Sequence, residues 1–99
     1  MSTTTWRWAP LARVESWVPS AKAMGVSKVA RSRGQFLDQY RRAGGDWRRL
    51  SDWWQARRNA FVARHMAQAR RNGERLYDPT TRGYSKRGLA LLMWAYDPR

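Results

Sequence analysis

Arginine and tryptophan are interleaved along this chain, and this pairing constrains the fold more than any other feature. The 99 residues include seventeen arginines and seven tryptophans, and the formal net charge is +13 at pH 7. Apolar residues make up 42% of the chain and aromatic residues 13%, which is enough to build a hydrophobic core. A chain of about 100 residues supports one such core. The composition therefore predicts a single folded domain with a strongly basic exterior.

Several classes of site are excluded or disfavoured by residue content. Cysteine is absent, which rules out disulfides and thiolate metal sites. His65 is the only histidine, and the seven carboxylates are dispersed without a ligand spacing, so we expect no metal and no cofactor. No pattern marks a nucleophile or an orienting acid for His65. We therefore expect a packed histidine, no catalytic residue and no enzymatic activity.

The sequence also carries no signal for a membrane. No apolar run approaches the roughly 20 residues that span a bilayer, and the N-terminus lacks the basic flank and apolar stretch of a secretory signal. We expect no membrane partner and a location in the cytoplasm or inside a host cell, with the virion as the alternative.

Apolar spacing predicts an all-α fold, a compact bundle of three main helices with one or two short N-terminal helices and an N-terminal arm. Residues 1–9 are expected to form the arm, ordered only if its tryptophans find a groove. A short helix is expected to follow Pro10 and to end at Pro19. Another short turn is expected between residues 20 and 29, broken near Gly25.

The three main helices are defined more firmly by their periodicity. The first is expected over residues 32–43, the longest from an N-cap at Ser51 to Asn72, and the last over residues 85–96. Residues 74–84 show neither helical nor strand periodicity and are expected to form a loop. No segment shows convincing strand alternation.

Two of these helix starts share a serine, basic residues and a glycine. Helix N-termini carry partial positive charge and unpaired amides, so cations there suggest a bound anion. The glycines would let a phosphate backbone come close. Alternatively, the serines are simple caps and the glycines serve close helix packing. The candidate residues are Arg31, Ser32, Arg33 and Gly34 at the first start, and Ser85, Lys86, Arg87 and Gly88 at the second.

Basic and aromatic residues on the long helix complete the candidate set. Aromatic faces stack on unpaired bases while arginines contact phosphates, a combination typical of single-stranded nucleic-acid binding. Trp54 and Trp94 fall on apolar stripes and are expected to be buried, so the adjacent Trp53 is the better candidate for contact with a partner. Trp6 and Trp8 are candidates too, either as docked anchors or as a stacking arm. The nucleic-acid candidates on this helix are Arg57, Arg64, Arg70 and Arg71.

Four runs of sequence are distinctive when taken together: Val29–Leu37, Tyr40–Gly45, Phe61–Gln68 and Leu89–Tyr96. They resemble a functionally uncharacterised family of small basic domains found in phages, large DNA viruses and some bacteria. The likeness covers about residues 26–98, so it divides the chain into a basic helical domain, 26–98, and an N-terminal arm and short helix, 1–25. It implies a viral or microbial origin and transfers no catalytic residue.

The summed charge favours a polyanion as partner, bound without turnover. Arginine, whose planar fork grips phosphate oxygens in pairs, accounts for all but three of the basic residues. We therefore expect a non-catalytic nucleic-acid-binding protein, with DNA favoured over RNA by the viral resemblance alone. The alternative is a structural or assembly protein of a virion or ribonucleoprotein, which anchors on a larger acidic protein through its tryptophans and arginines.

Overall fold

The computed structural model describes residues 6–99, and this part of the chain is predominantly helical, as predicted. Two short strands, β1 (Tyr77–Asp78) and β2 (Gly83–Tyr84), pair antiparallel between the last two helices. One 3-10 helix, η1 (Trp47–Arg49), precedes the longest helix. The α-helices are α1 (Leu11–Met24), α2 (Lys28–Arg31), α3 (Phe36–Arg42), α4 (Asp52–Asn72) and α5 (Lys86–Met93).

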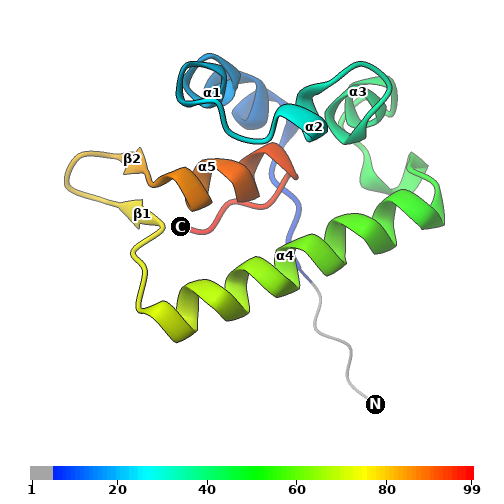
Figure 1. The fold of residues 1–99 in the computed structure, drawn as a ribbon. Helices are drawn as coiled ribbons and strands as arrows, with labels where there is room; N and C mark the ends of the chain where they lie inside the picture. Colours follow the sequence, from blue (N-terminus) through cyan, green and yellow to red (C-terminus); the bar gives the residue numbers. More distant parts are fainter. Residues whose placement is uncertain (1–5) are drawn as a thin grey trace.

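Helix α5 lies between the other long helices (Figure 1). It packs against α1 on one side and α4 on the other, while α2 and α3 pack on each other beside α1. The position of α5 follows from its sequence, because the helix carries apolar residues on nearly every face. Those that are buried include Leu89, Leu91, Leu92 and Met93. Trp94, at its end, stacks between Phe36 and Phe61, with ring centroids 4.9 and 4.8 Å away. No helix in the described part of the chain is both long and apolar enough to cross a membrane.

The predicted limits of the longest helix are confirmed. The Ser51 hydroxyl accepts a hydrogen bond from the Trp54 amide at 3.2 Å, as an N-cap should. Gly73 ends the helix in the left-handed conformation, with φ of 64°. Both limits depend on local interactions of the residues that flank the helix.

The expected end of the first helix at Pro19 is wrong. Helix α1 continues through this proline to Met24 and ends at Gly25, which is left-handed. Val14 and Ala21, on either side of Pro19, are both fully buried. Their packing offsets the free-energy cost of the backbone hydrogen bond that a proline removes from a helix interior.

Two other predicted boundaries are also wrong. Helix α3 begins at Phe36, four residues later than expected, because residues 32–35 form a turn in which Gly34 has φ of 76°. Helix α5 ends at Met93, where Ala95 adopts φ of 58° and the Tyr96 amide donates back to the Leu91 carbonyl at 3.1 Å. This reversal, and not a further helical turn, keeps Tyr96 buried. The predicted loop over 74–84 contains the β1–β2 pair.

The N-terminal segment is docked on the helical body from Trp6 onward; the rest of the predicted arm, residues 1–5, lies outside the described residues. The Ala9 amide donates to the Ala95 carbonyl at 2.7 Å, and the Tyr40 hydroxyl donates to the Ala9 carbonyl at 2.8 Å. The ring of Trp6 meets Tyr96 edge to face at 5.5 Å. This segment shares its core with the main body, and the division of the chain at residue 25 stays a prediction.

Candidate nucleic-acid interface

Most acidic side chains of this chain form ion pairs with arginines. The remaining basic side chains have no counter-ion within the described residues. Among residues 6–99, Asp52 is the one acidic side chain that forms no ion pair. The arginines in ion pairs are Arg13, Arg41, Arg42, Arg48, Arg75, Arg87 and Arg99. The described cations outside these pairs, apart from Arg58, are Arg7, Lys22, Lys28, Arg31, Arg33, Arg49, Arg57, Arg64, Arg70, Arg71, Arg82 and Lys86.

Arg58 is a structural cation that the sequence analysis did not single out. It is fully buried, and burial lowers its pKa to about 10, so it is still protonated at neutral pH. A signal was available, because Arg58 stands four residues after Trp54 and four before Val62, within the apolar stripe of α4. Its donors reach the carbonyls of Trp6, Arg7, Trp94 and Ala95 and the side-chain oxygen of Asn59.

The first predicted phosphate cradle, residues 31–34, does not open a helix. Its amide donor is used within the chain, since the Gly34 amide donates to Asp38 at 3.0 Å. The Ser32 hydroxyl donates to the Lys28 carbonyl at 2.5 Å, and the Arg31 side chain donates to the Val26 carbonyl at 2.9 Å. Arg33 is exposed. The segment is therefore a turn that holds its own polar groups.

The second predicted phosphate site, residues 85–88, lies at the start of α5. There its serine caps the helix and its glycine allows close packing. The Ser85 hydroxyl accepts from the Gly88 amide at 3.0 Å. A Cβ on Gly88 would lie only 2.2 Å from the Leu76 carbonyl oxygen, so this glycine permits the close approach of the chain before β1. The alternative stated in the sequence analysis, in which the serine is a simple cap and the glycine serves close packing, therefore describes Ser85 and Gly88. Lys86 is exposed.

Arg87 is held by side chains of the same chain. It donates to Glu74 at 2.9 Å, to Nδ1 of His65 at 2.8 Å and to Gln68 at 3.2 Å. The hydrogen bond from Arg87 lowers the pKa of Glu74, while burial, followed by the charge of Arg87, lowers the pKa of His65. A neutral His65 that accepts from Arg87 and stacks on Phe61 is the packed histidine that was expected.

The two predicted cradles do not face each other. In Figure 1, α5 begins beside β2, whereas α3 lies past α2 at the opposite side of the molecule. A single ligand site formed by both starts is therefore not present in this fold.

The long helix separates its four candidate arginines into two groups. Arg57, Arg64 and Arg71 follow one another at seven-residue steps and share one flank of α4. Arg70 projects about 100° away from Arg71, on the other side of the buried stripe. All four are exposed.

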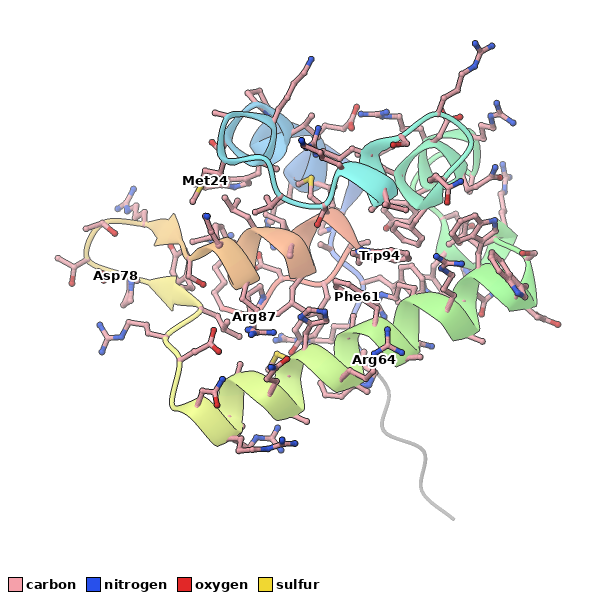
Figure 2. The ribbon with its side chains drawn as sticks, in the orientation of Figure 1. Met24, Phe61, Arg64, Asp78, Arg87 and Trp94 are labelled. Carbon is pink, nitrogen blue, oxygen red and sulfur yellow. The ribbon has the colours of Figure 1, made fainter. Side chains whose placement is uncertain are left out.

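Arg57 and Arg64 line a groove between α2, α4 and α5, together with Lys28 from α2. The groove has a volume of about 530 Å³, and no acidic side chain lines it. Figure 2 shows Arg64 and Phe61 projecting from α4 on the side where Trp94 ends α5. The aromatic rings of Phe61 and Trp94, with the small Ala90, contribute apolar surface to this groove. Lys28 is not among the residues predicted from the sequence, because only the tertiary fold brings α2 beside α4.

A shallower hollow lies next to this groove on α4, and Trp53 stands at one end of it. It is lined by Trp53, Ala56, Arg57, Ala60 and Arg64, so two arginines border both hollows. Trp53 is 59% exposed, as predicted, and the guanidinium of Arg57 lies 5.2 Å from the centre of its ring. Trp94 is buried as predicted, whereas Trp54, which was also expected to be buried, is only half-buried against the core.

Within residues 6–99, no three histidine, cysteine or acidic side chains gather where they could hold a metal ion. No protein-family model matches this chain, and no curated protein or solved structure is significantly similar to it. The resemblance to the family of phages, large DNA viruses and bacteria therefore stays a prediction.

Proposed function

We propose that this chain is a non-catalytic nucleic-acid-binding protein that acts through contacts between its basic side chains and phosphates. One observation carries the proposal: Lys28, Arg57 and Arg64, none of them in an ion pair with a described residue, border one groove that no acid lines. DNA is favoured over RNA on the sequence resemblance alone. The compact helical bundle would act in a cell, in a host cell or in a virion.

Uncompensated positive charge supplies the driving force for binding. Like charges that lie close together repel one another, and a polyanion relieves this repulsion. Arginine contacts phosphate through two parallel N–H donors, which adds geometry to the Coulomb attraction. Each phosphate that is neutralised releases counter-ions, so the affinity must depend on salt.

The first test is a salt titration of binding to a labelled oligonucleotide, followed by fluorescence anisotropy. If about six phosphates are contacted, affinity should fall by about three decades or more between about 50 and 200 mM salt. A flat salt response would discard the proposal.

A pair of double variants tests the groove itself. Arg57→Ala with Arg64→Ala removes two charges at the groove, and Lys22→Ala with Arg82→Ala removes two exposed charges elsewhere. The groove variant should reduce the slope of log affinity against log salt by about 1.4 to 1.8, which corresponds to two phosphate contacts. The control variant should change the slope less. Equal effects in both variants would mean that the charge acts diffusely and that the groove is not the binding surface.

A second function, that of a structural or assembly protein, is favoured by a separate hollow. Trp6, Trp8 and Trp47 line this cavity of about 680 Å³, and the Trp8 and Trp47 rings stack at 5.8 Å. Tryptophan is among the residue types most enriched at the binding hot spots of protein interfaces. Size-exclusion chromatography with and without nuclease treatment separates the two functions. Loss of co-purifying material that absorbs at 260 nm supports nucleic-acid binding, and a protein complex that survives nuclease supports assembly.

A further inference from the structure

We propose that the groove between α2, α4 and α5 receives one unpaired base of a single-stranded nucleic acid, while Arg57 and Arg64 contact the adjacent phosphates. This inference rests on the proposed function and deepens it, since it names the class of nucleic acid. Three features of the described residues support it: an aromatic wall, a cationic rim and a second aromatic surface across α4.

The aromatic wall is formed by rings that the core holds rigidly. Phe61 and Trp94 stack at 4.8 Å with an interplanar angle of 22°, and Trp94 is also stacked on Phe36. Ala90, between them and α2, adds no bulk to the groove. The volume of about 530 Å³ falls in the range of small-ligand pockets. A base in a duplex has both faces covered by its neighbours, so only an unpaired base can enter such a space.

The cationic rim comes from two helices. Arg57 and Arg64 stand two turns apart on α4, about 10 Å along its axis, and Lys28 faces them from α2. Arg57 and Arg64 are both exposed, and no acid in the described chain pairs with any of the three. The rim is therefore positive and the wall apolar, which matches a ligand that joins anionic groups to flat rings.

The second aromatic surface extends the path beyond the groove. Arg57 and Arg64 also border the hollow beside Trp53, and Ala56 and Ala60 keep the helix surface low between them. A strand that crosses α4 here would place one base on the exposed Trp53 ring and another in the groove, with phosphate at the arginines between. Stacking on an exposed ring such as Trp53, combined with phosphate contacts, is how proteins bind single strands without reading sequence. In the groove the base would meet the edges of the rings, because Trp94 is stacked between Phe36 and Phe61, and Phe61 stacks on both Trp94 and His65.

The charge argues for a nucleic-acid strand and against an acidic peptide. A phosphodiester chain carries one anion for every planar ring, and the surface alternates cations and aromatic rings in the same way. An acidic peptide would satisfy the three cations but would present no flat ring to Trp53 or to the groove.

The test compares three labelled probes of about 16 nucleotides, the upper range of single-strand site sizes. They are an oligothymidylate, an abasic strand with the same phosphates, and a duplex of the same length. At one salt concentration, the oligothymidylate should bind roughly tenfold more tightly than either of the others. It should also quench tryptophan fluorescence, which the abasic strand should not do.

Two variants locate the effect. Trp53→Ala and Ala90→Leu, which fills the groove, should each lower affinity for the oligothymidylate roughly tenfold and leave affinity for the abasic strand unchanged. Trp47→Ala, which changes another exposed tryptophan outside this surface, is the matched control and should retain the oligothymidylate preference. Far-UV circular dichroism of each variant establishes that it is folded.

The outcomes distinguish this inference from the proposed function. Equal, salt-dependent affinity for all three probes would overturn the single-strand inference and leave nucleic-acid binding intact. No salt-dependent binding to any probe would overturn both. Binding of polyglutamate as tight as that of the oligothymidylate would also overturn the base pocket, because polyglutamate supplies charge without rings.

Discussion

The guanidinium of Arg58 lies 3.8 Å from the centre of the Trp8 ring, so a buried cation rests on the face of a tryptophan from the N-terminal segment. Arg58 forms no ion pair with any described carboxylate. Backbone carbonyls and an aromatic face take the place of water and counter-ion around it. One side chain of α4 thereby fastens the N-terminal segment to the residues that end α5.

Replacing this side chain should therefore unfold or strongly destabilise the protein. Arg58→Ala removes a buried side chain that donates to four backbone carbonyls, two of them in fully buried contacts, and should lower the free energy of unfolding by about 3 kcal/mol or more. The neighbouring Arg57 is exposed, and Arg57→Ala should change the free energy of unfolding by no more than about 0.5 kcal/mol. Urea denaturation followed by circular dichroism measures both.

If Arg58→Ala does not fold, Arg58→Lys keeps the comparison possible. Lysine retains a charge but offers three donors from one atom, so it cannot reach all four carbonyls and should still cost more than about 1 kcal/mol. Equal stability of the Arg57 and Arg58 variants would contradict the structural role assigned to Arg58.

Local signals in the sequence were sufficient to predict α4, and its N-cap can be tested directly. The Ser51 hydroxyl satisfies the Trp54 amide, so Ser51→Ala should lower the free energy of unfolding by about 1 kcal/mol. Ser16 lies exposed inside α1, where its hydroxyl donates to the Arg13 carbonyl. Ser16→Ala should cost nothing, because alanine is the better helix former there. Thermal melts of the two variants should differ accordingly.

Features that depend on residues distant in sequence could not be predicted. The cost of Pro19 inside α1 is offset by contacts with other helices, which the periodicity of α1 does not reveal. The backbone carbonyls that accept from Arg58 lie before residue 10 and after residue 93, so its burial follows from the tertiary fold. The candidate groove is a similar case. Its arginines were predicted from α4, but their neighbours Lys28 and Trp94 come from two other parts of the chain.

The two serine and glycine motifs look alike in sequence, yet their glycines should respond differently to substitution. Gly88→Ala places a methyl group against the Leu76 carbonyl, which is fixed by a hydrogen bond from the Ser85 amide at 3.0 Å. We expect it to cost about 2 kcal/mol or more. Gly34→Ala meets no atom within 4 Å and should cost about 1 kcal/mol for its positive φ alone. Melting temperatures that rank Gly34→Ala below Gly88→Ala would refute the packing role of Gly88.

The cluster formed by His65, Arg87 and Glu74 predicts how stability depends on pH. Burial and the charges of Arg87 and Arg64 lower the pKa of His65 from its ordinary value of 6.5, although Glu74 acts in the opposite direction. Between pH 6.5 and the lower folded value, the unfolded chain binds more protons than the folded chain. The stability contributed by neutral His65 is therefore complete above about pH 6.5 and is lost as the pH falls through the folded pKa.

Protonated His65 can no longer accept the hydrogen bond from Arg87, so the melting temperature should decrease from about pH 7 to about pH 5. His65→Gln removes the titrating group and should flatten this decrease. Below pH 4.5 a second loss is expected in both proteins, because Arg87 lowers the pKa of Glu74 and the carboxylate is neutralised there. A melting temperature that is equally pH-dependent in the wild type and in His65→Gln between about pH 7 and 5 would show that His65 is not the group responsible.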